Sequence, residues 1–222
     1  MKSFDWLYEH VRAHRAGEDL EALLPHPRSR DELAAVADDR LLSDLSRRVF
    51  RAGLKHSLVD SKWPVFEEVF WGFDPHKLVL MSDEQLERLM HDDRIIRHFG
   101  KIKSVRANAL MVTELAAEAG SFARFLADWP GEDIIGLWAL LKKRGSQLGG
   151  NSGPAFLRMV GKDTFLLTDD VVAALKAQGI VDRKPTAKRD LQLVQNAFNQ
   201  WQRESGRPLC QISRLLSMTV GW

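Results

Sequence analysis

Two adjacent carboxylates, Asp169 and Asp170, follow Thr168 in the stretch DTFLLTDDVVAAL. Thr168 has the chemistry of a helix N-cap, which places both acids in the first turn of a helix. The helix dipole favours negative charge at that position, so the pair could stabilise a reacting group that becomes positive. Two acids at a helix start also serve simply as capping residues, and the sequence leaves both interpretations open.

A glycine-dense segment, GSQLGGNSGP, lies between two helical stretches and precedes these acids. Its glycines permit positive φ and leave backbone N–H groups uncovered, and a helix that opens at Pro154 would bring its positive end beside them. Such an arrangement can hold a phosphate. The glycines are Gly149, Gly150 and Gly153, and the basic residues one turn earlier are Lys142, Lys143 and Arg144. A plain turn between helices with a solvated basic face is the alternative.

The elements that would position these residues are helices. Apolar residues recur at helical spacing almost throughout, for example at Phe4, Leu7 and Val11, and no stretch alternates strictly as a strand would. Ser82 and the glutamine three residues later have capping-box spacing, and a helix could start at Ser61. The sequence predicts an all-α protein of about ten helices.

Composition excludes several classes of protein. The chain has 222 residues, of which 45% are hydrophobic and 28% are charged, so it is too apolar to be disordered, and no run is long enough to span a membrane. The N-terminus lacks the pattern of a signal peptide. The single cysteine, Cys210, allows no internal disulfide and suits a reducing cytoplasm. The net charge of +2 predicts local rather than global basic surfaces.

The order of glycine hairpin, short helix, FLLT and Asp169 resembles the helix-hairpin-helix/Gly-Pro-Asp superfamily of DNA glycosylases. The pieces AGL, FDP, DDRIIRHFGKI, the following NA, and LKKRG resemble the bacterial 3-methyladenine DNA glycosylase I family. The resemblance covers roughly Asp38 to Gly179. It implies a two-lobed helical DNA glycosylase fold with a helix-hairpin-helix motif at about residues 141–161. Residues 1–30 then form an N-terminal helical extension, and residues 31–222 form the glycosylase-like domain.

The chain departs from the family pattern at several positions. Arg48 stands where the family has an acidic pocket residue, His56 replaces an aromatic residue after AGL, and Ser152 replaces the second glycine of the hairpin. The family's zinc ligands are absent, since the chain has one cysteine and has Asp170 where a ligand histidine would fall. We therefore expect no metal and no other cofactor.

The resemblance implies a base-excision repair enzyme that hydrolyses the N-glycosidic bond of an alkylated purine such as 3-methyladenine. Asp169 would be the catalytic carboxylate, with Asp170 as its neighbour. Base-pocket candidates are His56, Trp63, Phe50 and Trp71. DNA-binding candidates are the hairpin residues Lys142, Lys143, Arg144, Gly149, Gly150, Ser152 and Gly153, together with Lys101 and Lys103.

No lysine occupies the position after the hairpin that the superfamily's lyases use, so we expect simple hydrolysis. The expected partner is damaged double-stranded DNA, bound by a monomer in the bacterial cytoplasm at the nucleoid, and no membrane is involved. Two alternatives stay open. One is a helix-hairpin-helix DNA-binding protein whose catalysis is lost or altered, which Arg48 and His56 favour. The other is a glycosylase for a different lesion.

Overall fold

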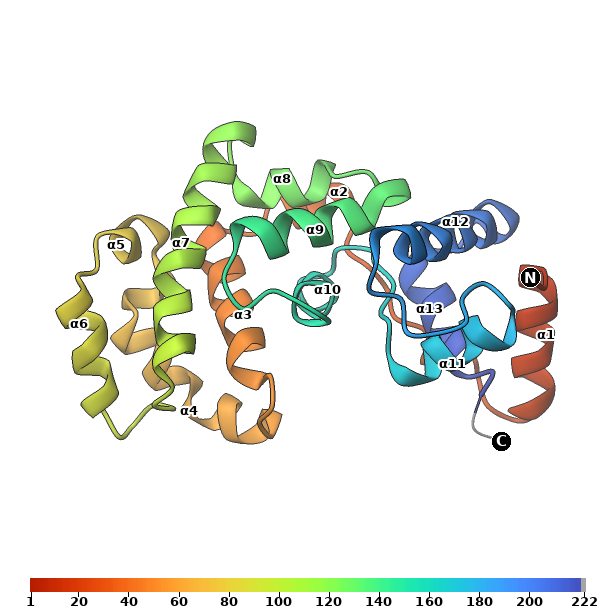
Figure 1. Cartoon of the computed structure of the whole chain (residues 1–222), viewed down its shortest axis with the longest axis horizontal. Helices are drawn as coiled ribbons and strands as arrows, with labels where there is room; N and C mark the ends of the chain where they lie inside the picture. The colour runs from red at the N-terminus through yellow and green to blue at the C-terminus, as the bar shows by residue number, and fades with distance from the viewer. Residues whose placement is uncertain (221–222) are drawn as a thin grey trace. The chain divides into compact units, whose positions relative to one another are not determined.

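The structure is a computed structural model that describes residues 1–220. Within these residues the regular structure is entirely helical, which confirms the all-α prediction. The α-helices are α1 (Phe4–His14), α2 (Arg30–Ala34), α3 (Asp38–Arg51), α4 (His56–Val69), α5 (Pro75–Val79), α6 (Asp83–Arg88), α7 (Phe99–Ala119), α8 (Phe122–Asp128), α9 (Ile134–Arg144), α10 (Ser152–Met159), α11 (Asp169–Ala177), α12 (Lys188–Ser205) and α13 (Leu209–Ser217) (Figure 1). Four short 3-10 turns lie between them at Glu21–Leu23, Trp71–Phe73, Leu89–His91 and Gly131–Asp133.

Helix boundaries follow local capping chemistry in most places. Ser82 accepts from the backbone of Gln85 and the Gln85 side chain accepts in return, so the predicted capping box is present at α6. Thr168 caps α11 as predicted, by accepting from the Val171 N–H. The predicted helix start at Ser61 was wrong, because α4 begins at His56 and carries Pro64 in its interior.

The described chain forms two compact units. Unit 1 consists of Met1–Arg28, Pro130–Leu137 and the chain from Asp163 onward, whereas unit 2 consists of Ser29–Trp129 and Trp138–Lys162. This division differs from the predicted N-terminal extension of residues 1–30. The first 28 residues belong to unit 1 because the apolar face of α1 is buried within it.

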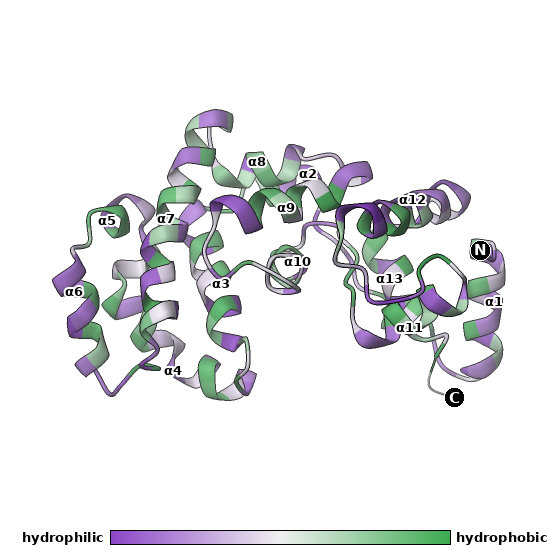
Figure 2. Cartoon of the chain, viewed as in Figure 1, coloured by the Kyte–Doolittle hydropathy of each residue, from purple (hydrophilic) through white to green (hydrophobic). Residues whose placement is uncertain are grey.

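The core of unit 1 joins the first helix to the last two. The buried α1 residues Phe4, Leu7 and Val11 form a single stripe at helical spacing, and α1 contacts both α12 and α13. Trp201 of α12 is fully buried, and its indole N–H donates to the Lys2 carbonyl over 3.0 Å. Green, hydrophobic residues gather along α13 in Figure 2, in agreement with its burial.

The core of unit 2 surrounds the long helix α7, which contacts α3, α5, α6 and α8 (Figure 1). Beside this helix lies a cluster of aromatic side chains contributed by α3, α4 and the 3-10 turn that follows α4. Its members are Phe50, Trp63, Phe66, Phe70 and Phe73, and all are at most 2% exposed. Burial on this scale is the main source of the unit's stability.

Several buried helix ends are satisfied by side chains from other elements. Asp38 of α3 accepts from the backbone N–H groups of Phe122 and Ala123 at the start of α8, each at 2.9 Å. Lys162 donates to the Ala127 and Trp129 carbonyls at the end of α8. In unit 1, Asp163 accepts from the first two N–H groups of α13, each at 2.9 Å. These contacts replace the water that an exposed helix end would bind.

One polar network connects α3 and α4 next to the aromatic cluster. Arg40 donates two hydrogen bonds to the Glu67 carboxylate, both at 3.0 Å, and Ser43 donates a third. The Trp63 indole N–H in turn donates to the Ser43 hydroxyl over 3.0 Å. Burial of Glu67 opposes its ionisation, but the hydrogen bonds from Arg40 and Ser43 outweigh that effect and hold the pKa of the carboxyl below its ordinary value.

We expect Glu67→Gln to lower the free energy of unfolding by about 2 kcal/mol at neutral pH, since it removes the charged acceptor of Arg40. Urea denaturation measures this loss. The matched control is Glu68→Gln, because Glu68 is exposed and pairs only at the surface with Arg94, and it should change stability by less than about 0.5 kcal/mol. Equal losses for the two variants would contradict the role of the network.

The stability of wild type and the stability of Glu67→Gln should depend differently on pH in the acid range. The folded-state pKa of Glu67 lies below its unfolded value of 4.5, so its contribution is full above that value and is lost as the pH falls through the folded pKa. The stability difference between wild type and Glu67→Gln should therefore shrink as the pH is lowered below 4.5. A difference that stays constant from neutral to acid pH would show that ionisation of Glu67 is not the cause.

Candidate functional site

The glycine segment forms a tight turn between α9 and α10, at the place where the sequence predicts it. Gly145 must be glycine, because a Cβ there would lie 2.5 Å from the Leu148 side chain and 2.7 Å from the Leu141 carbonyl. Leu148 is buried beneath the turn, and Gln147 and Gly150 adopt φ values of 63° and 57°. The turn is therefore folded tightly around one apolar anchor.

Asn108 of α7 fixes this turn from below. Its side-chain oxygen accepts from the Ser146 N–H at 2.7 Å, and its side-chain nitrogen donates to the Ser146 carbonyl at 3.1 Å. Asn108 is fully buried and Ser146 is half-buried, so both bonds are partly shielded from water. Sequence reasoning did not assign this role, although a polar residue beside the apolar stripe of α7 at Val105 and Val112 was a usable signal.

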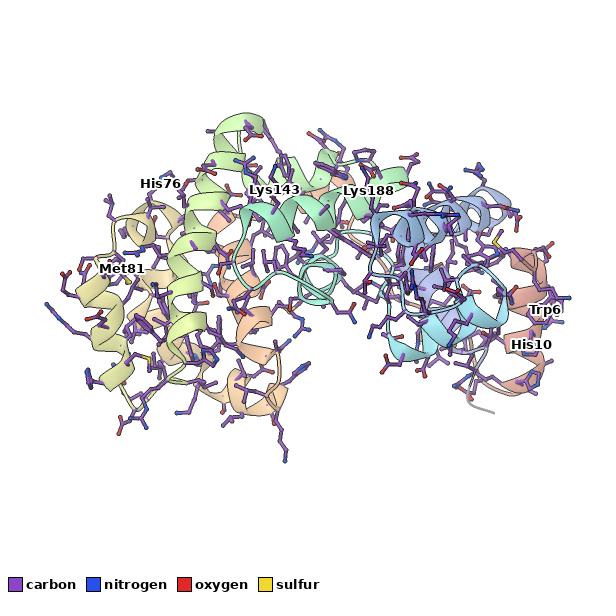
Figure 3. All side chains as sticks on the ribbon, in the orientation of Figure 1. Trp6, His10, His76, Met81, Lys143 and Lys188 are labelled. Carbon is purple, nitrogen blue, oxygen red and sulfur yellow. The ribbon has the colours of Figure 1, made fainter. Side chains whose placement is uncertain are left out.

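The outer surface of the turn is open and partly basic. A Cβ added to Gly149 or Gly150 would meet no heavy atom within 4 Å, so nothing covers the backbone there. Lys142 and Lys143 are exposed, and Lys143 is visible on α9 in Figure 3. The helix α10 begins without a side-chain cap. Two of these features are what a phosphate requires, namely uncovered backbone at Gly149 and Gly150 and nearby cations.

Three other hairpin candidates have structural contacts. Arg144 forms ion pairs with Glu114 at 3.1 Å and Glu118 at 2.7 Å, so its charge is already balanced within unit 2. Gly153 is buried, and a Cβ there would lie 3.1 Å from the Leu148 carbonyl. The Ser152 N–H donates to the Gly149 carbonyl. All three support the turn itself.

The two lysines predicted on α7 have different environments. Lys103 is exposed and lines a cleft of about 300 Å³ together with Arg106 and Ser146, next to the start of the hairpin turn. Lys101 is only 8% exposed, and its ammonium group donates to the Phe50 and Ala52 carbonyls at 3.1 and 2.6 Å. The prediction of Lys101 as a surface DNA contact is therefore corrected: it caps the C-terminal end of α3.

The predicted base-pocket residues divide into two groups. Phe50 and Trp63 lie inside the aromatic cluster, where Trp63 stacks on Phe66 at 4.8 Å and the Arg47 guanidinium lies 5.1 Å from the Trp63 ring. Their faces are occupied, so the prediction that they line an open pocket is corrected to a role in the core.

Trp71 and His56 are the accessible members of the predicted pocket. Trp71 is 41% exposed and adopts φ of 53°, next to Phe73 at 58°. Left-handed backbone at two bulky residues is strained, and such strain concentrates at functional sites. His56 is exposed at the first position of α4. These two side chains could meet a ligand without repacking the core.

The predicted catalytic pair lies in unit 1. Asp169 and Asp170 open α11 as the sequence implies, and both are exposed. The Asp169 side chain is 97% exposed, and its carboxylate lies 3.4 Å from the Lys184 ammonium group. The positive end of α11 and this lysine together provide a favourable position for a negative group.

Residues 1–220 contain no group of three or more His, Cys, Asp or Glu side chains placed to hold a metal ion. Across the same residues, no helix is both long and apolar enough to cross a membrane.

Comparisons of the sequence with known proteins find similarity to methyladenine glycosylases. A sequence model of the methyladenine glycosylase family matches residues 33–145. A segment of 76 residues is 36% identical to DNA-3-methyladenine glycosylase 1 of Escherichia coli strain K12, and this segment is 34% of the present chain and 41% of that relative.

Solved structures show the same fold. A crystal structure of 3-methyladenine DNA glycosylase I has a TM-score of 0.50 at 24% identity, covering 66% of this chain and 90% of that one. The Staphylococcus aureus enzyme, in a structure described as the basis of 3-methyladenine recognition, has a TM-score of 0.51 at 21% identity, covering 68% and 90%. Since the family match spans half of the sequence, from α2 to the hairpin turn, the chain belongs to the methyladenine glycosylase family.

Proposed function

We propose that this protein is a base-excision repair DNA glycosylase that hydrolyses the N-glycosidic bond of an alkylated purine such as 3-methyladenine. The observation that carries the proposal is the open glycine turn, held by Asn108, in a chain of this family. The relatives named above are glycosylases for 3-methyladenine.

In this proposal the hairpin turn holds the DNA backbone. Uncovered N–H groups at Gly149 and Gly150 bind a phosphate, and Lys142 and Lys143 add a positive field that attracts the strand. Lys103 extends the basic surface along α7. Contacts of this kind position the enzyme on any duplex and carry no base specificity.

The damaged nucleotide must leave the stack before its glycosidic bond can be attacked, at a cost of a few kcal/mol. Trp71 and His56 supply exposed rings that could contact the extruded base, and a cationic alkylated base gains roughly 0.5–2 kcal/mol on an aromatic face. Phe50 and Trp63 stabilise the core beneath them rather than the base itself.

Asp169 is the proposed catalytic carboxylate. Bond cleavage gives the sugar oxocarbenium character, by analogy with glycosides. A carboxylate stabilises that charge and orients or deprotonates the attacking water. The water oxygen bonds to the anomeric carbon, and the bond electrons leave with the base. Gly153–Met159 contains no lysine, which fits hydrolysis without lyase chemistry.

The protein is proposed to act as a monomer on double-stranded DNA, without a cofactor, in the bacterial cytoplasm at the nucleoid. The buried thiol of Cys210 is compatible with a reducing compartment.

A second function is favoured by two observations. Arg48 reverses the charge expected at the pocket position, and Asp169 is almost fully exposed within its unit, whereas carboxylates tuned for catalysis are usually desolvated. A DNA-binding protein with lost or altered catalysis would share every feature of the hairpin. An incision assay on alkylated, deaminated and oxidised duplexes separates this possibility from a glycosylase and identifies the lesion.

Duplex DNA binding should depend strongly on salt. If about five phosphates are neutralised, the affinity should fall on the order of a few hundredfold between 50 and 200 mM salt. Fluorescence anisotropy with a labelled duplex measures the slope. A flat titration, or no binding at low salt, would exclude the proposed mode of DNA binding.

Asp169→Asn should abolish base release from alkylated DNA and leave the melting temperature and the DNA affinity unchanged. The matched control is Asp170→Asn, at the neighbouring position of the same helix turn. Release of abasic product is the readout for both variants. Undiminished release by Asp169→Asn would assign the catalytic role to another residue.

Asn108→Ala should lower stability by about 2 kcal/mol, since it removes both hydrogen bonds to the half-buried Ser146 backbone. It should also weaken DNA binding about tenfold by releasing the turn, which equals about 1.4 kcal/mol. The control is Asn196→Ala on the exposed face of α12, which should alter neither quantity. Unchanged DNA affinity in Asn108→Ala would mean that the turn is not the contact.

A further inference from the structure

The end of α3 in unit 2 carries an unusual concentration of positive charge. Arg48 and Arg51 lie one helical turn apart, and Lys101 of α7 reaches the carbonyls of Phe50 and Ala52 at the same helix end. Arg51 is balanced by Asp60, with guanidinium-to-carboxylate distances of 2.6 and 2.7 Å. This cationic cluster, defined as Arg48, Arg51 and Lys101, therefore contains a single carboxylate partner.

Arg48 is the member without a partner. Its side chain is half-buried, its Nε atom is fully shielded from solvent, and that N–H has no hydrogen-bond acceptor. Burial lowers the pKa of the Arg48 guanidinium, and the charge of Arg51 lowers it further. The pKa of Lys101 is lowered by burial and then by the charge of Arg48. The three cations thus repel one another in a partly dry environment.

Such an arrangement is costly for the protein alone. Most half-buried cations are paired, because an unpaired buried charge loses its hydration without compensation. Arg40, for comparison, binds Glu67 through two hydrogen bonds. Arg47, next to Arg48, at least lies over the ring of Trp63. A negatively charged ligand would relieve the repulsion at Arg48.

The chain that follows the cluster is accessible to such a ligand. Residues 53–58 are exposed. The helix α4 begins at His56 with no side-chain cap and no acidic residue in its first turn. An exposed lysine, Lys55, precedes it. The turn between α3 and α4 thus adds positive charge and no negative charge.

We propose that Arg48 binds a phosphate group of the nucleic-acid backbone at the turn between α3 and α4, while Lys101 stays on the α3 carbonyls and Arg51 stays paired with Asp60. The two terminal nitrogens of a guanidinium group can donate side by side to phosphate oxygens, and they are the donors that this contact would use, since Nε is shielded. The contact is separate from the glycine turn, so unit 2 would hold the DNA strand at two points. The inference rests on the proposed function, because DNA supplies the phosphate.

Arg48→Met tests the proposal with little risk to folding, since methionine keeps an unbranched apolar stem at this position and removes the repelling charge. In sodium chloride, without phosphate, the variant should melt at a higher temperature than wild type. Phosphate is excluded from protein surfaces and so stabilises both proteins to some extent. Relative to sodium chloride at equal ionic strength, sodium phosphate should therefore raise the melting temperature of wild type by more than that of Arg48→Met. The control is Arg124→Met, an exposed arginine of α8 in the same unit.

DNA binding provides the second arm of the experiment. Arg48→Met should bind a duplex about tenfold more weakly than wild type at 50 mM salt. One lost phosphate contact reduces the salt slope by about 0.9, so the difference should narrow to about threefold at 200 mM. Arg124→Met should keep the wild-type slope.

The outcomes distinguish the possibilities. A lower melting temperature in Arg48→Met, with an unchanged salt slope, would make Arg48 a structural residue and overturn the inference. A phosphate effect on melting without any change in DNA binding would indicate a site for free phosphate, which also overturns it. If wild type binds DNA and Arg48→Met binds it equally well, the inference about Arg48 fails and the proposed function survives. If wild type binds no DNA, both fail.

Discussion

The helix ends are the constraint on which this fold depends. The thirteen α-helices of the described chain create many termini, and each terminus that is buried leaves N–H or carbonyl groups without intrahelical partners. The protein satisfies them with side chains from distant elements: Asp38 and Lys162 at the two ends of α8, Lys101 at the end of α3, and Asp163 at the start of α13. Apolar burial supplies the driving force, but these polar contacts decide which helix lies next to which.

The need to satisfy buried backbone groups also positions the proposed DNA contacts. Lys101 satisfies the end of α3 and thereby fixes the cationic cluster, whereas Asn108 satisfies the backbone of Ser146 and thereby fixes the glycine turn. Neither residue needs to touch a ligand to determine where one binds. In the proposed function, the buried polar residues of α7 therefore act by positioning the contacts and the exposed lysines act by making them. Lys101 and Asn108 find their hydrogen-bond partners within the fold, whereas the Nε–H of Arg48 has no acceptor.

Sequence patterns predicted the local features well, because capping and glycine turns depend on neighbouring residues. The capping box at Ser82, the cap at Thr168 and the hairpin turn lie where expected. Interpretation was less successful where a side chain's environment depends on distant elements. Lys101 and Trp63 were assigned to the surface and the pocket, but both are buried. Periodicity identifies the apolar face of a helix, but it does not reveal whether a lysine on that face will find carbonyls within reach. For the same reason, the sequence did not place α1 with α12 and α13.

Lys101 and Asn108 of α7 are seven positions apart, which is close to two full helical turns, so their side chains project from the same side of the helix. At 1.5 Å per residue, their backbones are about 10.5 Å apart along the axis. The helix α7 therefore sets the distance and the relative orientation between the end of α3, which Lys101 binds, and the glycine turn, which Asn108 binds. Substitutions on the outer face of α7 leave this distance and orientation unchanged. The insertion of one residue between Lys101 and Asn108 would rotate one of these side chains about the helix axis by about 100° relative to the other. The length of this short stretch is consequently under stricter constraint than its composition.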